Sequence, residues 1–319
     1  MRVFVAGASG AIGRHLVPRL VAAGHEVHGM TRSESKRAML AELGAVPVVA
    51  DALDPDQVAE AVGKAKPDVI VHQLTGLAGK GMRGLKRRMG MTNRLRTEGT
   101  DHLLSAGQAV GVRRFVAQSN YALYARTGGQ VKSEEDPVDP SPPGKLREGL
   151  AAIRHLEQAV LDARWTEGIV LRYGGFYGPG TNMAPGEDLF EMVRKRRFPL
   201  IGDGGGVWSF IHIADAAEAT VAAVEHGSRG VYNIVDDDPA PVAEWLPALA
   251  RTLGAKKPIR VPRFVVRLFA GEAGVVMMTE ARGASNDKAK RELDWRPAYP
   301  SWREGFATAR QRQPQGTVA

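Results

Sequence analysis

Three glycines near the start of the chain have the spacing that a phosphate-binding turn requires. Gly7, Gly10 and Gly13 lie in the segment Gly7-Ala8-Ser9-Gly10-Ala11-Ile12-Gly13, directly after the apolar run 3–6. Glycines allow a tight turn and a close approach of the backbone to a pyrophosphate, and the following helix offers unpaired N–H groups and the positive end of its dipole. Because a strand precedes the turn and a helix follows it, the pattern predicts a dinucleotide site.

The residues at the end of the second expected strand indicate which dinucleotide binds. A carboxylate at this point would bind a ribose 2′-hydroxyl group and repel a 2′-phosphate. This chain has no carboxylate there and instead has Met30-Thr31-Arg32-Ser33, followed by Lys36 and Arg37. A guanidinium group can hold a phosphate while it stacks on adenine. Arg32 therefore predicts NADP(H) in preference to NAD(H), and a surface arginine in a basic stretch is the alternative.

Alternating apolar segments predict the elements that position this turn. Strands are expected at 3–6, 25–30, 46–50, 68–72, 114–118 and 168–173, and helices at 12–23, 36–43, 58–62, 97–109 and 150–161. Near-continuous apolar strands that alternate with helices are typical of a parallel sheet covered on both faces. We therefore expect an α/β fold, a Rossmann-type doubly wound parallel sheet with a smaller C-terminal substrate lobe.

The strict alternation of strands and helices weakens after about residue 175, where Gly and Pro become more frequent, and this predicts the division of the chain into two parts. Residues 1–175 are expected to form the dinucleotide-binding domain, to which 203–235 return, and 176–319 are expected mainly to form the substrate-binding lobe. The segment 126–146 is rich in Gly, Pro, Asp, Glu and Ser, which predicts a long loop. A loop of this length in a compact domain is usually functional or mobile.

Composition excludes several classes of site. The chain has 319 residues, of which 44% are hydrophobic and 24% charged, as in an ordinary globular protein. It has no cysteine, so we expect no disulfide, no thiolate nucleophile and no cysteine-based metal site. The apolar stretches end within about 10 residues, whereas a membrane span needs roughly 20. We expect a cytoplasmic protein without a secretory signal, a membrane partner or a bound metal.

The net charge of +8 raises the question of a nucleic-acid partner. The basic residues gather in two runs, Lys80, Arg83, Lys86, Arg87, Arg88, Arg94 and Arg96 in the first, and Arg194-Lys195-Arg196-Arg197 in the second. Neither run has interleaved aromatic residues or a recognisable nucleic-acid module, which favours solvated faces. We therefore expect no nucleic-acid partner, and an anionic cofactor or substrate is the alternative use of this charge.

Eight further segments, spread over nearly the whole chain, carry a resemblance to a known family. They are 51–53, 99–104, 111–116, 171–180, 201–204, 210–215, 232–234 and 285–297. Together with the glycine turn they resemble the extended short-chain dehydrogenase/reductase family, which includes nucleotide-sugar epimerases and dehydratases. The resemblance implies that 51–53 contacts adenine and that 171–180 lies beside the nicotinamide, with Tyr173 where Pro is usual. It also implies a homodimer formed by the fourth and fifth helices.

The turn and the resemblance together define a candidate cofactor site. Its residues are Gly7, Ser9, Gly10, Ala11, Ile12, Gly13, Arg32, Ser33, Asp51, Ala52, Leu53, Gln73, Leu74, Thr75, Gln118, Ser119, Tyr173, Gly174 and Phe176. In the same comparison, Trp208 and His212 occupy the segment where the family approaches its substrate. For Trp208 a lobe-core aromatic is an equal alternative, and for His212 a structural role is favoured.

The usual catalytic residues of that family are missing. They are a Ser or Thr after the fifth strand, then a Tyr, and a Lys four residues after it, whose ammonium group makes the Tyr hydroxyl a usable acid or base. The resemblance places Asn120, Gly149 and Ile153 at these positions, and no Tyr-x-x-x-Lys occurs in the chain. The remaining candidate catalytic residues are Asn120, Tyr121 and Tyr124.

Three functions fit these observations. The first is an atypical NADP(H)-dependent oxidoreductase that acts on a small or medium-sized organic substrate with a non-standard catalytic set. The second is an epimerase, dehydratase or lyase with a retained cofactor. The third is a non-catalytic NADP(H)-binding regulatory protein, since the fold alone does not decide activity.

Overall fold

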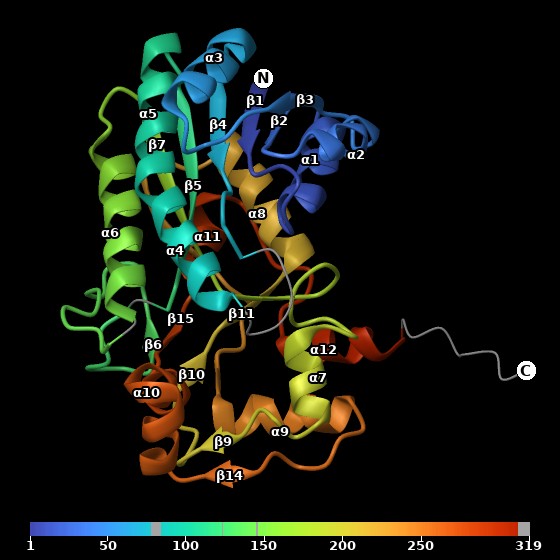
Figure 1. Cartoon of the computed structure of the whole chain (residues 1–319), viewed down its shortest axis with the longest axis vertical. Coiled ribbons are helices and arrows are strands. Elements are labelled where there is room, and N and C mark those ends of the chain that lie inside the picture. Colours follow the sequence, from blue (N-terminus) through green and yellow to red (C-terminus); the bar gives the residue numbers. More distant parts are fainter. Residues whose placement is uncertain (78–83, 123, 145, 312–319) are drawn as a thin grey trace, which may run out of the picture.

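A seven-stranded parallel sheet forms the centre of the larger part of the molecule (Figure 1). The computed structural model describes residues 1–77, 84–122, 124–144 and 146–311. The strand order is β12-β7-β5-β4-β1-β2-β3, and every pairing is parallel. The strands are β1 (Arg2–Ala6), β2 (Glu26–Thr31), β3 (Val46–Val49), β4 (Val69–His72), β5 (Arg114–Asn120), β7 (Glu167–Tyr173) and β12 (Gly230–Ile234).

Helices cover both faces of this sheet. They are α1 (Gly13–Ala22), α2 (Arg37–Glu42), α3 (Pro55–Ala65), α4 (Leu85–Arg96), α5 (Glu98–Val110), α6 (Leu146–Asp162) and α8 (Ile213–Glu225), and η1 (Glu34–Lys36) is a short 3-10 turn. One apolar core lies beneath α1, α2 and α8, and a second lies beneath α3, α5 and α6. Figure 1 shows the two helical layers on opposite sides of the sheet. The predicted Rossmann-type α/β fold is therefore confirmed.

Local sequence explains where α3 begins and ends. Asp54 precedes the helix and accepts hydrogen bonds from the backbone N–H groups of Asp56 and Gln57, at 3.1 Å each. Pro55 occupies the first helical position, where its missing N–H group is not needed. Lys66 ends the helix in the left-handed region with φ of 44°. The sequence predicted a helix over 58–62, and the structure extends it at both ends.

Helix α4 was not predicted. The sequence interpretation treated 80–96 as a basic run, and its residues Lys80 and Arg83 lie outside the described residues. From Leu85 to Arg96 the run is helical, and it buries Thr92, Leu95 and Arg96 against neighbouring elements. The helix is so polar that its apolar periodicity is weak, and packing against α5 and α6 determines it.

The long segment 126–146 is attached to the C-terminal part of the chain. Its short strand β6 (Val131–Lys132) pairs in parallel with β15 (Gly283–Ala284). Arg126 forms ion pairs with Asp139 at 3.2 Å and with Glu280 at 2.9 Å. The loop predicted from composition is therefore anchored at several points along its length.

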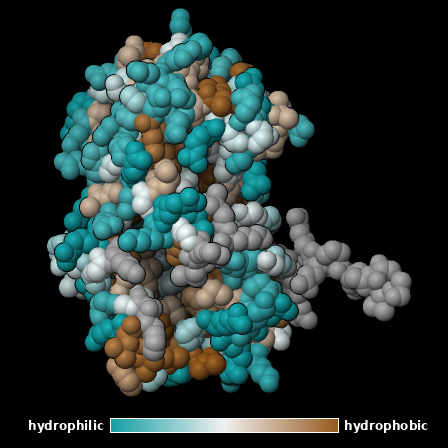
Figure 2. All heavy atoms as spheres, viewed as in Figure 1, coloured by the Kyte–Doolittle hydropathy of each residue, from teal (hydrophilic) through white to brown (hydrophobic). Residues whose placement is uncertain are grey.

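A third apolar core belongs to the lower part of the molecule in Figure 1. Its elements are β8 (Gly175–Tyr177), α7 (Asp188–Arg194), β9 (Leu200–Ile201), β10 (Val207–Trp208), β11 (Phe210–His212), β13 (Ala240–Pro241), α9 (Val242–Thr252), β14 (Arg260–Val261), α10 (Arg263–Thr279) and α12 (Trp302–Gln311). Helix α11 (Asp287–Glu292) instead packs against β12, and its Ala289 belongs to the first core. Trp245, Phe210, Trp302 and Phe306 pack together at its centre. Figure 2 shows apolar atoms gathered over α10 at the lower end, where Phe264 and Leu268 are exposed.

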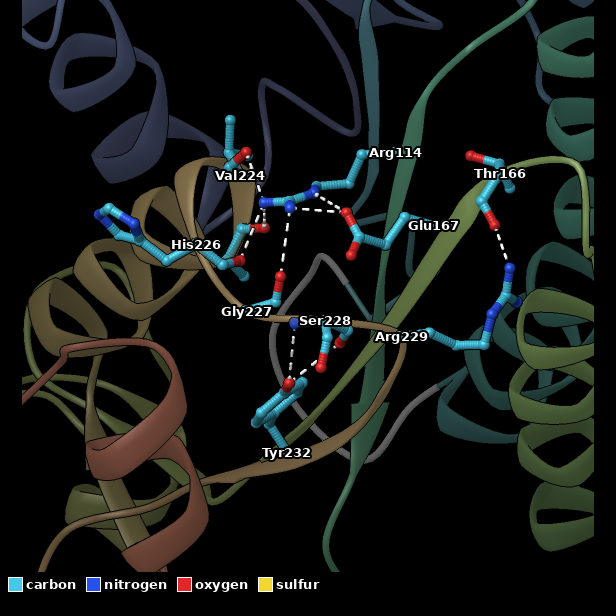
Figure 3. Close-up of polar contacts among 10 residues, drawn as sticks. Arg114, Thr166, Glu167, Val224, His226, Gly227, Ser228, Arg229 and Tyr232 are labelled. Carbon is cyan, nitrogen blue, oxygen red and sulfur yellow. Dashed lines mark hydrogen bonds and ion pairs between the residues drawn. The ribbon is translucent and has the colours of Figure 1, made fainter.

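Arg114, at the start of β5, joins β5 to the start of β7 and to the end of α8 (Figure 3). Its guanidinium group donates to the Glu167 carboxylate at 3.0 and 2.6 Å. It also donates to the carbonyl oxygens of Ala223, Val224, His226 and Gly227 at the end of α8, at 2.8 to 3.2 Å. A cation at a helix C-terminus satisfies carbonyl groups that have no partner within the helix. Arg114 is therefore a structural residue that fixes α8 against the sheet.

No helix among the described residues is long and apolar enough to cross a membrane. Within the same residues, no group of three or more His, Asp or Glu side chains is placed to hold a metal ion.

Candidate functional site

The glycine turn follows β1, the strand at which the strand order reverses. The chain adds β2 and β3 on one side of β1, and then β4 and β5 on the other side. In doubly wound sheets this point lies at the carboxyl ends of the strands and receives the ligand. Gly7 has φ of 93°, and a Cβ atom there would lie 2.7 Å from the Gln73 carbonyl oxygen. A Cβ atom on Gly13 would lie 2.3 Å from the Ala8 carbonyl oxygen. The turn therefore needs glycine at both positions, and this cradle fits a pyrophosphate.

Hydroxyl and basic groups surround the end of β2 beside this turn. The Ser9 and Thr31 hydroxyl groups are hydrogen-bonded at 3.0 Å, and Lys36 Nζ donates to Ser9 Oγ at 3.5 Å. The Ser33 backbone N–H group donates to Thr31 Oγ1 at 3.3 Å. Arg32 follows β2 and is exposed. The arrangement can hold a phosphate on the ribose of the adenosine, with Lys36 as a second cation that the sequence-based site did not include.

The segment after β3 forms a fixed turn where adenine was expected. Asp51 accepts a hydrogen bond from the Leu53 N–H group at 3.1 Å, and its own N–H group donates to Gln57 Oε1 at 3.0 Å. The carbonyl oxygen of Ala52 accepts from the His102 ring at 3.0 Å. Because β1 and β3 run in the same direction, 51–53 and the glycine turn both follow the carboxyl ends of their strands. Contact of 51–53 with adenine stays a prediction.

The ends of β4 and β7 meet through buried polar groups. Gln73 Nε2 donates to the Tyr173 hydroxyl oxygen at 3.0 Å, and that hydroxyl also bonds to Thr220 at 2.6 Å. Burial raises the pKa of Tyr173 to about 12, while the bonds from Thr220 and Gln73 oppose this shift. Among the described residues, Gln73 Oε1 is buried and has no hydrogen-bond partner. Tyr173 is therefore a core residue. Its hydroxyl group, which contacts Gln73, links it to the candidate site.

The remaining members of the cofactor set differ in exposure. Leu74, Thr75 and Gln118 are half-buried at strand ends, and Phe176 is half-buried with its ring 5.3 Å from that of Tyr173. Gly174 is packed so closely that a Cβ atom would lie 2.8 Å from the Phe210 carbonyl oxygen. Their contact with the cofactor stays a prediction.

A buried polar network lies behind the end of β5. Arg172 donates two hydrogen bonds to the Glu157 carboxylate, at 2.8 and 2.6 Å, and a third to the Tyr124 hydroxyl oxygen at 2.9 Å. Ser119 donates to Glu157 at 2.6 Å, and Tyr124 donates to Asn233 Oδ1 at 2.7 Å. Burial alone would lower the pKa of Arg172, but the hydrogen bonds and charge of Glu157 raise it above its usual value. Ser119 and Tyr124 are thus held inside this network.

The three candidate catalytic residues come together here, but their polar groups already have protein partners. The Tyr121 hydroxyl oxygen accepts from the Ser209 N–H group at 3.1 Å, and burial raises the pKa of Tyr121. Burial also raises the pKa of Tyr124, against the opposing effect of Arg172. Asn120 Oδ1 accepts from the Ala122 N–H group at 2.7 Å. These contacts favour structural roles for the two tyrosines, and the sequence-based assignment of an acid at either of them stays a prediction to be tested.

Trp208 and His212 also have structural partners. Trp208 Nε1 donates to the Met277 carbonyl oxygen at 2.8 Å, and its ring packs on Trp245 with centroids 4.9 Å apart. His212 Nδ1 accepts from the Ala214 N–H group at 3.3 Å at the start of α8. Its ring lies 3.9 Å from that of Tyr299. These contacts favour the structural alternatives for both residues, and their contact with substrate stays a prediction.

Helix α6 carries the two positions where the usual Tyr and Lys are missing. Apart from the backbone of α6 itself, a Cβ atom on Gly149 would have only Asn93 Oδ1 within 4 Å among the described residues, at 4.0 Å. Ile153, one turn later, is buried and packs with Leu150 and Val138. The positions therefore offer open space and an apolar surface instead of an acid and a cation.

Comparison with known proteins now decides the family. A model of the NAD dependent epimerase/dehydratase family matches residues 3–235. The chain belongs to this family. Its resemblance to extended short-chain dehydrogenases is confirmed by that match. With the phosphate cradle and the relatives below, the chain is an NAD(P)-dependent oxidoreductase of the epimerase/dehydratase family that acts on a small molecule.

Two reductases are similar to this chain over nearly the whole length of both proteins. A 3-diazoavenalumate denitrifying reductase from a Streptomyces species is 44% identical over 312 residues, which cover 96% of this chain and 99% of the relative. A 4-hydroxy-2-methyl-3-oxo-4-farnesyl-3,4-dihydroquinoline-1-oxide ketoreductase from Stigmatella aurantiaca is 27% identical and covers 100% of this chain and 98% of its own. These relatives support an enzyme and not a non-catalytic binding protein.

Solved structures of the family share the fold. The UDP-glucose 4-epimerase of Thermotoga maritima has a TM-score of 0.76 at 21% identity, with 98% of each chain covered. The UDP-glucose 4-epimerase of Thermus thermophilus in complex with NAD has a TM-score of 0.74 at 23% identity, with 100% of each chain covered. At such identities the likeness shows the architecture alone.

Proposed function

We propose that this chain is an NADPH-dependent reductase that replaces the diazonium group of an aromatic substrate with hydrogen. The observation that carries the proposal is α6, which has Gly149 and Ile153 where the family's carbonyl chemistry needs a proton donor and its cation. The denitrifying reductase that is 44% identical gives the substrate class. A reaction that protonates no oxygen has no use for the missing pair.

The chemistry of a diazonium group explains why an acid is not needed. In the reaction the aryl carbon–nitrogen bond breaks, N2 leaves, and a carbon–hydrogen bond forms with a hydride equivalent as the two-electron reductant. Bound NADPH supplies that hydride. Ketone reduction differs, since negative charge develops on oxygen and a nearby acid contributes about 10²- to 10⁴-fold to the rate. The protein has to hold and orient the substrate and keep water out, for which an apolar wall at Ile153 is suited.

The residues at the end of β2 support NADP(H) over NAD(H). Ser9, Arg32, Ser33 and Lys36 would hold the 2′-phosphate, and the turn that needs Gly7 and Gly13 would hold the pyrophosphate. Two further expectations stay predictions: the division of the chain near residue 175, and a homodimer through the predicted helices 97–109 and 150–161, which are α5 and α6.

The test is turnover of a defined arenediazonium compound. Purified enzyme with NADPH and 3-diazonium-4-hydroxycinnamate is expected to give 4-hydroxycinnamate and N2, with one NADPH oxidised for each product molecule. Product and NADP⁺ are measured by chromatography, with protein-free and NADPH-free mixtures as controls for spontaneous loss of N2. Absence of enzyme-dependent product, together with turnover of a ketone, would contradict the proposal and favour a ketoreductase like the Stigmatella relative.

The tyrosines near β5 give a second prediction. Tyr121→Phe and Tyr124→Phe are each expected to keep kcat for the diazonium compound within about threefold, because their hydroxyl groups bond to Ser209, Arg172 and Asn233. The thermal midpoint is expected to fall, since each change leaves a buried polar group without its partner. A loss of kcat above about 100-fold in a folded variant would identify that tyrosine as the acid and contradict this assignment.

A further inference from the structure

Arg96 is a buried arginine whose guanidinium group has no hydrogen-bond partner among the described residues. It is the last residue of α4 and is only 8% exposed. Within the part of the chain that the structure describes, its side chain makes no hydrogen bond and no ion pair within 4 Å. Arg172 is similarly buried, at 4% exposed, but donates three hydrogen bonds. Burying a charge without a partner is costly, so an unpaired guanidinium points to a ligand.

The charges near Arg96 do not neutralise it. Glu157 is close enough to raise the pKa of Arg96, but burial outweighs it and lowers that pKa to about 10. The Glu157 carboxylate is already bonded to Arg172 and Ser119. On the other side, burial lowers the pKa of His72 to about 4, and the charge of Arg96 adds to this shift, so His72 is neutral. Arg96 itself stays charged at neutral pH.

The open space on α6 lies on the side that Arg96 shares with Asn93. Residues three apart lie on one face of a helix, as do Gly149, Ile153 and Glu157 at intervals of four. Asn93 is nearest to Gly149, Arg96 interacts with Glu157, and α4 packs against α6. Ile153 lies between those two points of α6. The guanidinium is therefore beside the space left by the missing tyrosine and lysine.

A second buried polar atom points to the same space. Among the described residues, Asn93 Oδ1 is buried, has no hydrogen-bond partner, and is the only atom outside the backbone of α6 within 4 Å of a Cβ atom built on Gly149. One face of α4 thus presents a donor group and an acceptor atom, both without protein partners, to an apolar surface on α6. A flat aromatic molecule with an anionic oxygen and a hydrogen-bond donor matches that pair.

We propose that Arg96 is a substrate-binding residue that holds an anionic oxygen, either carboxylate or phenolate, of an aromatic substrate beside Gly149. The aromatic character rests on the proposed function, whereas the anionic oxygen rests on Arg96 and its surroundings. A carboxylate can accept two parallel hydrogen bonds from a guanidinium group. The substrate then supplies the negative charge that pairs with Arg96. The cation that α6 lacks is then provided by α4.

Binding of an unreactive ligand tests this without turnover. We would titrate 4-hydroxycinnamate, its methyl ester and cinnamate into the NADP⁺-saturated enzyme by calorimetry, for the unmodified protein, Arg96→Gln and Arg96→Lys. Arg96→Gln is expected to lose about 10- to 100-fold in affinity for the ligand that carries the recognised oxygen, and Arg96→Lys less. Selective loss for the two acids identifies the carboxylate, and loss confined to the two phenols identifies the phenolate.

Stability separates this role from a structural one. Because Arg96 has no protein partner, Arg96→Met is expected to keep or raise the thermal midpoint while it weakens ligand binding. The matched control is Arg94→Gln, two residues earlier, whose exposed side chain is paired with Glu98. This control is expected to bind all three ligands like the unmodified protein.

Three results would overturn the proposal. The first is that the unmodified enzyme binds 4-hydroxycinnamate, its methyl ester and cinnamate with equal affinity. The second is that Arg96→Gln binds these ligands as tightly as the unmodified enzyme does. The third is that Arg96→Gln loses affinity for NADP⁺ alone, which would assign Arg96 to the cofactor site. The outcome is independent of the proposed function. If the enzyme binds the anions through Arg96 but does not reduce the diazonium compound, the inference about Arg96 stands and the proposed function is wrong. If Arg96→Gln reduces the diazonium compound with an unchanged KM, the proposed function stands and the inference about Arg96 is wrong.

Discussion

Replacement of Arg172 by methionine is expected to lower the free energy of unfolding by about 3–5 kcal/mol, because it leaves the Glu157 carboxylate buried without its charged partner. Both side chains are nearly inaccessible, and the two hydrogen bonds between them are short. The Tyr124 ring, whose centroid lies 5.0 Å from the guanidinium carbon, loses a cation as well. Urea denaturation followed by circular dichroism measures the change.

The control for this prediction has the same chemistry at the surface. Arg94 also donates two hydrogen bonds to a glutamate, Glu98, at 2.8 and 2.7 Å, but both side chains are solvent-exposed. Arg94→Met is expected to leave the urea midpoint unchanged, since water solvates the carboxylate that remains. The double variant Arg172→Met with Glu157→Leu is expected to recover part of the loss. Equal effects of the Arg94 and Arg172 replacements would show that burial of the pair is not what matters.

The parts of the fold that depend on local sequence were predictable. The glycine turn follows from a strand, three glycines and an amphipathic helix within the first 22 residues, and the structure places Gly7 at positive φ. Buried strands such as β4 are continuous apolar runs, which a parallel sheet requires. Helix α4 was missed because its sequence is mostly basic and has weak apolar periodicity. Its packing against α6, about 50 residues further along the chain, together with the adjacent α5, stabilises it.

The partners of side chains were not predictable, because they come from remote segments. Tyr121 and Tyr124 were correctly placed after β5, but Ser209 and Asn233, about 90 to 110 residues away, occupy their hydroxyl groups. Arg96 was grouped with Arg94 as part of a solvated face. Two residues apart on a helix are on different faces, so Arg94 is exposed while Arg96 is buried. That spacing becomes informative only once α4 is known to be a helix.

Replacing Arg32 with alanine is expected to raise the Kd for NADPH by about 10- to 100-fold and to change the Kd for NADH little. Only NADPH carries a phosphate on the 2′-oxygen, and the exposed Arg32 directly follows Thr31, whose hydroxyl group is hydrogen-bonded to that of Ser9. Lys36 supplies a second cation at this point, so Lys36→Ala is expected to act in the same direction with a smaller effect. Quenching of tryptophan fluorescence by each cofactor gives both constants.

The discriminating comparison is with Arg37→Ala, which removes an exposed arginine that is 3.5 Å from Glu34 and so tests general basic charge. If long-range attraction alone favoured NADPH, the Arg32 and Arg37 variants would weaken it equally, and both effects would vanish at high salt. If Arg32 binds the phosphate directly, its variant alone loses the preference, and Arg32→Asp goes further toward NADH because a carboxylate accepts the free 2′-hydroxyl group. An Arg32→Ala enzyme that still prefers NADPH as strongly as before would return Arg32 to the protein surface and leave Lys36 as the residue to examine.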